Sequence, residues 1–191
     1  NGFFIGEHGL YDKRFMYEES LRIPLLVRWP AVVRPGSRAE ALALNVDFAP
    51  TFLEAAGLPV PADMQGRSLM PVLRGRVPAD WRTSMYYRYY HDPGHHNTAA
   101  HLGVRTATHK LIHYWKKDAY EMFDLVKDPA EQRNLLHSAA DAQQPEIAAK
   151  FSELKAEIAR LQKAKKSLSG LAHICAHGDD GPCPIIEAFS S

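Results

Sequence analysis

Four short segments between residues 84 and 125 constrain the fold of this chain more than any other feature. They are rich in aromatic and β-branched residues and are separated by turn-forming residues, which is typical of strands. They are SMYYRYY (84–90), LGVRTAT (102–108), KLIHYW (110–115) and YEMFDL (120–125). We therefore predict an antiparallel sheet of about four strands. The tyrosines predict that the first strand is buried on both faces.

A single apolar stripe follows these segments. From Pro145 onward, apolar residues recur at spacings of three and four, which predicts a helix of about five turns that covers one face of the sheet. They are Ile147, Phe151, Leu154, Ile158 and Leu161. The sequence from Ser167 has no such period and predicts a poorly ordered or surface-wrapped tail. We therefore assign 83–166 to a sheet-and-helix subdomain and 167–191 to a tail.

The first 30 residues predict a different organisation. Residues 1–12 combine glycines, aromatics and acids without a period, which indicates a loop of the kind that often carries function. A short helix is predicted over Phe15–Leu21. The compact apolar run Ile23–Trp29 predicts a buried strand.

A further helix of about ten residues is predicted after Asp47. Asp47 suits an N-cap, and Gly57 suits a C-terminal stop. Residues 58–82 contain four prolines and predict an irregular connection. We place a domain boundary there, so that 1–82 forms one block.

Composition and charge exclude several classes of protein. The chain is 46% hydrophobic and 24% charged, as in globular domains, and 23 basic residues against 22 acidic ones predict no binding to nucleic acid. No apolar run approaches the roughly 20 residues of a membrane span, and the N-terminus lacks the pattern of a signal peptide. Cys175 and Cys183 leave two alternatives open, a local disulfide or two free thiols.

Five motifs in a fixed order resemble the sulfatase family. They are NGFFIGEHGLYDKRFMYEESLRIPLLVRWP (1–30), VDFAPTFLEAAG (46–57), GRSLMPVLRG (66–75), GVRTATHKLI (103–112) and YEMFDLVKDPAEQRNL (120–135). The family is formylglycine-dependent and belongs to the alkaline phosphatase superfamily. The resemblance implies an α/β fold class, in which this chain is the C-terminal part of the sulfatase α/β sandwich plus a small antiparallel sheet domain packed by a C-terminal helix.

The resemblance implies a calcium site at the start of the chain. Sulfatases hold calcium with upstream carboxylates and an Asp-Asn pair, and Asn1 matches the Asn of that pair. Calcium takes six to eight oxygen ligands, so one amide oxygen cannot form the site alone. Upstream residues are therefore expected to complete it.

Lys13 matches the lysine that contacts the sulfate group in sulfatases. A fixed cation suits this chemistry because sulfuryl transfer spreads negative charge over oxygens. His8, five residues earlier, is expected to contact substrate or to support the loop. The alternative for Lys13 is an ordinary surface lysine.

The family nucleophile has no match in this chain. Sulfatases form it from a Cys or Ser in the motif Cys/Ser-x-Pro/Ala-x-Arg, and neither Cys175 nor Cys183 has the required neighbours. The formylglycine is therefore expected upstream, and this chain alone is expected to be inactive.

Histidines cluster in HDPGHHNTAAH, which includes His91, His95, His96 and His101. The spacing matches no familiar zinc motif. A similar His loop occurs in sulfatases that act on glycosaminoglycan or N-acetylglucosamine sulfates, where it leans over the active site. His96 and His101 are thus the candidates for sugar contacts, with solvated loop histidines as the alternative.

The resemblance as a whole implies a sulfuric ester hydrolase acting on a sulfated small molecule or glycan. Two alternatives remain open, a phosphonate or phosphodiester hydrolase of the same superfamily and a non-catalytic carbohydrate-binding fragment. The family also implies a periplasmic or secreted location.

Overall fold

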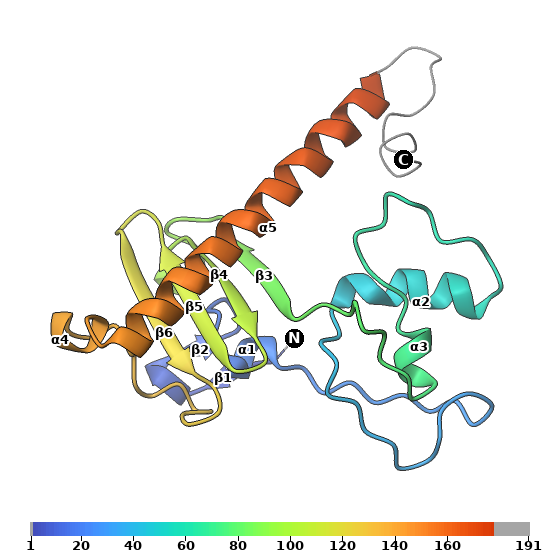
Figure 1. Cartoon of the computed structure of the whole chain (residues 1–191), viewed down its shortest axis with the longest axis horizontal. Helices are drawn as coiled ribbons and strands as arrows, with labels where there is room; N and C mark the ends of the chain where they lie inside the picture. Colours follow the sequence, from blue (N-terminus) through green and yellow to red (C-terminus); the bar gives the residue numbers. More distant parts are fainter. Residues whose placement is uncertain (1, 178–191) are drawn as a thin grey trace. The chain divides into compact units, whose positions relative to one another are not determined.

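The computed structural model describes residues 2–177, with side chains through residue 166. The chain divides into two compact units (Figure 1). The first combines the residues up to Leu25 with Thr83–Leu161, and the second combines Leu26–Arg82 with the residues from Gln162 onward. The predicted boundary near residue 82 coincides with a division between units. The block 1–82, however, is split, because the first 25 residues pack on the sheet.

The first unit is built on the predicted four-stranded sheet. All neighbouring strands pair antiparallel and follow chain order. The strands are β3 (Ser84–Tyr89), β4 (His101–Thr106), β5 (His109–Tyr114) and β6 (Ala119–Asp124). β3 is an edge strand whose residues are mostly half-buried, so the prediction that it is buried on both faces is wrong.

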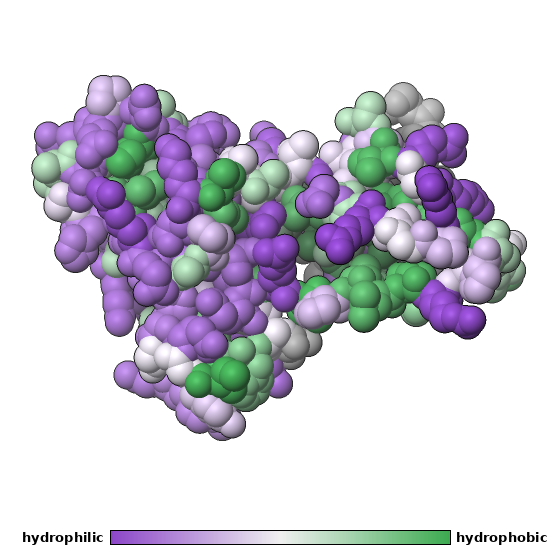
Figure 2. Space-filling model, turned by 90° about the horizontal axis from the view of Figure 1, so that it is seen from below, coloured by the Kyte–Doolittle hydropathy of each residue, from purple (hydrophilic) through white to green (hydrophobic). Residues whose placement is uncertain are grey.

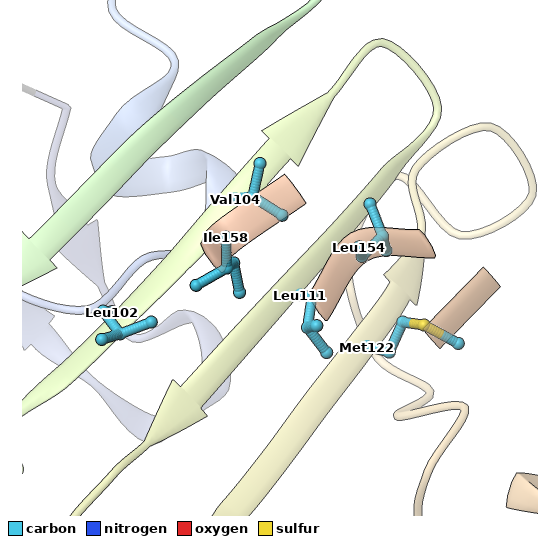
Figure 3. Packing of buried hydrophobic residues seen from close by; sticks show 6 residues of the cluster. All are labelled: Leu102, Val104, Leu111, Met122, Leu154 and Ile158. Atoms are coloured by element: carbon cyan, nitrogen blue, oxygen red, sulfur yellow. The ribbon is translucent and has the colours of Figure 1, made fainter. Parts of the chain in front are cut away.

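Helix α5 (Pro145–His177) covers one face of the sheet through the predicted apolar stripe (Figure 1). Figure 3 shows the core that results, formed by Leu102, Val104, Leu111, Met122, Leu154 and Ile158. The other three stripe residues pack against this cluster while half-buried. They are Ile147, Phe151 and Leu161. The predicted packing of the stripe is therefore confirmed.

The same helix is longer than the stripe suggests. It continues through residues 167–177, where the sequence predicts a tail without regular structure. This stretch lacks proline and includes two Leu and two Ala residues, which are good helix formers, so the backbone hydrogen bonding of the helix continues. The rest of the predicted tail, including Cys183, lies outside the described residues. A short helix, α4 (Ala139–Ala142), precedes α5, and Ser138 Oγ caps it by accepting from the Asp141 N–H at 3.1 Å.

The N-terminal segment covers the opposite face of the sheet. Met16 is fully buried and joins Ile112, Tyr114 and Phe123 in a second core. Gly103 on β4 permits this packing, because a Cβ there would lie 2.5 Å from Met16 Sδ. Helix α1 (Glu18–Leu21) follows and is shorter than the predicted helix over 15–21.

Removing a stripe side chain should destabilise the first unit in proportion to its burial. We expect Leu154→Ala to cost about 2 to 3 kcal/mol, because Leu154 is only 1% exposed. Phe151→Ala should cost less, because Phe151 is half-buried at the edge of the core. Amide hydrogen exchange of β4 and β5 in the full-length protein would measure the loss of stability in both variants. Equal and small losses in the two variants would contradict the conclusion that Leu154 is packed more deeply than Phe151.

Between residues 26 and 82, the second unit contains two short α-helices joined by irregular segments. They are α2 (Phe48–Ala55) and α3 (Met70–Leu73). The first was predicted, whereas the second lies within 58–82, where the sequence predicts an irregular connection. Asp47 precedes α2 but does not cap it with its side chain. Its buried carboxylate instead accepts the Arg67 N–H at 2.8 Å and pairs with Arg82. These interactions outweigh the desolvation that burial imposes on the carboxyl group, so the pKa of Asp47 is lowered.

The predicted buried strand Ile23–Trp29 is not a strand in this structure. Its backbone pairs with no strand of the described residues, and Leu26 is 93% exposed. A strand needs a neighbour to satisfy its backbone, which an apolar run cannot supply by itself. Other apolar side chains of the second unit are also exposed, including Phe52 and Leu58. Figure 2 shows hydrophobic surface, in green, interspersed with hydrophilic surface, in purple.

Candidate active-site hairpin

A small hairpin at the start of the chain carries the residues for which sequence predicts chemistry. Its strands β1 (Phe4–Ile5) and β2 (Tyr11–Asp12) pair antiparallel around the 3-10 turn η1 (Glu7–Gly9). Phe4 is fully buried and faces the core, whereas Ile5 and Tyr11 are exposed. The hairpin is thus fixed on one side and open on the other.

Gly2 fixes the start of this hairpin against α1. Its N–H donates to the Ser20 carbonyl at 3.2 Å. A Cβ at position 2 would lie 1.9 Å from the Glu19 carbonyl oxygen, so no other residue fits this approach. Asn1, the predicted calcium ligand, lies outside the described residues.

Lys13 directly follows the hairpin and is exposed. Its Nζ lies 6.0 Å from the centre of the Phe3 ring, a weak cation–π contact. The neighbouring Asp12 and Arg14 pair with each other. Within the described part of the chain, Lys13 forms no ion pair. Its ammonium is therefore available to an anion.

His8 supports the hairpin from inside. Its ring stacks on Tyr17 at 4.2 Å between centroids, and its Nε2 lies 3.5 Å from Glu19 Oε2. Tyr17 in turn donates to Glu121 Oε2 at 2.8 Å. Burial, with the nearby carboxylate of Glu121, raises the pKa of Tyr17 well above its ordinary value, so this donor keeps its proton. The sequence allows two roles for His8, contact with substrate and support of the loop, and this geometry fits support of the loop.

The His loop between β3 and β4 reaches the hairpin through His96. His96 is exposed, its Nε2 lies 3.8 Å from Asp12 Oδ2, and its ring lies edge-on to Tyr11 at 6.4 Å. The 3.8 Å separation is longer than a hydrogen bond but allows attraction when His96 is protonated. Residues far apart in sequence, Lys13 and His96, are thus presented on neighbouring segments of one unit.

His101 occupies a different environment. It is fully buried on β4, its Nδ1 lies 2.9 Å from the Ala99 carbonyl oxygen, and its ring stacks near Phe15, Tyr87 and Tyr89. Burial lowers the pKa of His101, which favours the neutral ring. This geometry does not place His101 for a direct contact with a sugar. Its role here is to fill the aromatic layer under the His loop.

A buried ionic network that sequence reasoning missed holds α1 on the sheet. The Nζ of Lys110, which is fully buried, lies 2.9 Å from Glu18 Oε1 and 2.7 Å from Glu131 Oε1. Glu131 also accepts the Glu18 N–H at 2.7 Å, and Arg105 pairs with Glu18 at 3.0 Å. The two positive and two negative charges balance, as buried charges require.

The two glutamates of this network differ in proton affinity. Burial raises the pKa of Glu131, and attraction to Lys110 does not cancel that effect. Burial also opposes the charge on Glu18, but hydrogen bonds from Arg105 and Lys110 prevail and lower its pKa. One signal in the sequence was available, a lysine at the start of a strand that is otherwise mostly apolar and aromatic.

The described residues hold no group of three or more His, Cys, Asp or Glu side chains arranged to bind a metal ion. Among the same residues, no helix combines the length and apolar character needed to cross a membrane.

The fold and its relatives define the C-terminal portion of a sulfatase. The family described as N-sulphoglucosamine sulphohydrolase, C-terminal, matches residues 6–164, and the chain belongs to this family. The predicted resemblance and fold class are thereby confirmed.

Two curated relatives bear names that specify a sugar sulfate. The chain is 48% identical over 168 residues to an N-acetylglucosamine-6-O-sulfatase of Bacteroides thetaiotaomicron, covering 86% of this chain and 29% of the relative. It is 38% identical over 91 residues to the human N-acetylglucosamine-6-sulfatase, covering 47% of this chain and 16% of the relative. The chain thus spans less than a third of the length of these relatives.

Two solved structures resemble the fold. One is a protein in complex with its substrate D-glucosamine-2-N,6-O-disulfate, at 46% identity and a TM-score of 0.79, covering 86% of this chain and 33% of that one. The other is a phosphonate monoester hydrolase from Silicibacter pomeroyi, at 26% identity and a TM-score of 0.56, covering 69% of this chain and 27% of that one.

Proposed function

We propose that the full-length protein hydrolyses a sulfate ester on a glucosamine-containing glycan, and that this chain supplies Lys13 to bind the sulfate group. The observation that carries the proposal is the exposed Lys13 ammonium, which forms no ion pair among the described residues and follows a fixed hairpin. The names of the relatives, which specify 6-sulfated glucosamine derivatives, support the substrate class.

Each residue of the hairpin and the His loop has a distinct role in this proposal. Lys13 attracts the nonbridging oxygens of the sulfate and stabilises the charge that develops on them during transfer. His96, exposed beside Asp12, contacts the sugar, and His8 keeps the hairpin in place. The attack on sulfur belongs to a formylglycine that no motif of this chain encodes. A calcium ion with Asn1 as one ligand also belongs to the proposal.

A direct assay separates this function from its nearest alternative. Likeness to a phosphonate monoester hydrolase favours phosphonate esters as the second candidate substrate class. The full-length protein should release sulfate from N-acetylglucosamine 6-sulfate with a higher kcat/KM than it shows on a phosphonate monoester. The reverse order of kcat/KM would replace the proposed function with the alternative.

His96→Ala should change substrate binding more than the chemical step. Because the His96 side chain is exposed and its Nε2 lies 3.8 Å from Asp12 Oδ2, beyond hydrogen-bond distance, its loss should leave the fold intact. We expect KM for a 6-sulfated glucosamine substrate to rise about tenfold, as for one lost polar contact, with little change in kcat. An aryl sulfate, which has no sugar, should show no such rise. An equal rise for both substrates would contradict a sugar contact.

A further inference from the structure

The position of the Lys13 ammonium depends on its backbone. Its side chain is exposed, and within the described residues its ammonium makes only the 6.0 Å contact with the Phe3 ring. A long lysine side chain has many rotamers, so ordering it on a substrate carries an entropic cost. That cost is smallest when the Cα from which the side chain starts is held still.

Two hydroxyl groups hold the backbone at this point. Ser20 Oγ donates to the Lys13 carbonyl oxygen at 2.6 Å, and the Tyr87 hydroxyl donates to the Arg14 carbonyl oxygen at 3.2 Å. The donors come from different elements, since Ser20 lies on α1 and Tyr87 on β3. Consecutive carbonyl groups are thus fixed from two directions.

Both donors are themselves fixed. Ser20 is 7% exposed, its carbonyl accepts the Gly2 N–H, and its helix is tied to the sheet by Glu18. The Tyr87 ring packs 5.6 Å from the His101 ring. Burial raises the pKa of Tyr87, so the phenol remains a donor throughout the neutral range.

We propose that Ser20 and Tyr87 are positioning residues for sulfate transfer, which act by fixing the backbone carbonyls of Lys13 and Arg14. The inference rests on the proposed function, because it assigns a task to Lys13. Neither hydroxyl touches substrate in this proposal. Their whole effect on the reaction passes through the lysine.

The test uses the full-length protein and a double-mutant design. Ser20→Ala should lower kcat on N-acetylglucosamine 6-sulfate about tenfold, because small displacements of a positioned group are costly, and should weaken inhibition by inorganic sulfate several-fold. Tyr87→Phe should have a smaller effect in the same direction, since its hydrogen bond is longer. Ser37→Ala is the matched control, because Ser37 Oγ donates to the Arg34 carbonyl at 2.7 Å in the second unit. It should leave both values unchanged.

The decisive comparison repeats Ser20→Ala in a Lys13→Ala background. A residue that acts through Lys13 should have no further effect on kcat there, whereas a general loss of structure would add in full. Two results would overturn this inference and leave the proposed function standing. One is additive losses of kcat in the double variant. The other is normal kcat in both Ser20→Ala and Tyr87→Phe while Lys13→Ala is slow. Normal kcat in Lys13→Ala would overturn the proposed function and the inference with it.

Discussion

Lys13→Ala in the full-length protein should lower kcat on sulfate esters by about 10² to 10³, which corresponds to about 3 to 4 kcal/mol of transition-state stabilisation. The ammonium contacts sulfate in the ground state but attracts it more strongly as negative charge develops. The loss should therefore be greater in kcat than in binding. Steady-state kinetics with N-acetylglucosamine 6-sulfate measures both.

Two controls make this result specific. Lys13→Arg should not restore full activity, because a planar guanidinium presents its donors differently from a compact ammonium. The melting temperature of Lys13→Ala should stay near that of the wild type, since the side chain is exposed and buries little apolar surface. Turnover close to wild type for Lys13→Ala would remove Lys13 from the site.

Lys110→Met should destabilise the first unit by about 3 to 5 kcal/mol, because it leaves a buried carboxylate without its cation. Glu18 keeps Arg105 as a partner, but Glu131 is 3% exposed and loses the ammonium that lies 2.7 Å away. Amide exchange of β4 and β5 would report the loss as reduced protection.

The size of this loss should depend on pH. The pKa of Glu131 is already raised by burial, and removing Lys110 raises it further. The folded state then holds a proton that the unfolded chain releases at its ordinary glutamate pKa, so the variant loses stability as pH rises above that value. The difference from wild type should thus be smaller at acidic than at neutral pH.

A double variant tests the cause of this loss. Glu131→Gln in the Lys110→Met background removes the unpaired charge and keeps a carbonyl oxygen for the Glu18 N–H. It should recover most of the lost stability and remove the pH dependence. If the double variant is no more protected than Lys110→Met, then lost packing of the lysine chain, and not the unpaired carboxylate, causes the destabilisation.

Local sequence patterns predicted the elements whose partners are close in the chain. The four strands were indicated by aromatic and β-branched residues between turn-forming ones, and the helix by the spacing of the stripe from Ile147 to Leu161. Each strand pairs with the next one along the chain. The helix after Asp47 also formed as predicted, with Gly57 in a left-handed conformation at its end. Such features depend on neighbouring residues alone.

Features set by distant contacts could not be predicted in this way. Glu18, Lys110 and Glu131 form one ionic network, yet nothing in their spacing indicates that they meet. His101 resembles His96 in its sequence surroundings but points into the core because strand β4 has already begun. Ile23–Trp29 has the composition of a strand and lacks a pairing partner among the described residues.

The grouping of the first 25 residues with 83–161 sets a rule for building chimeras between this chain and its relatives. Suppose that a chimera takes only the sheet and helix from a relative. If the relative has no glycine at position 103, its side chain there would clash with Met16, and Glu18 would face a residue from the other parent in place of its own Lys110. The exchangeable cassette is therefore discontinuous. Residues up to 25 and residues 83–161 have to come from the same protein if either segment is to fold as it does here.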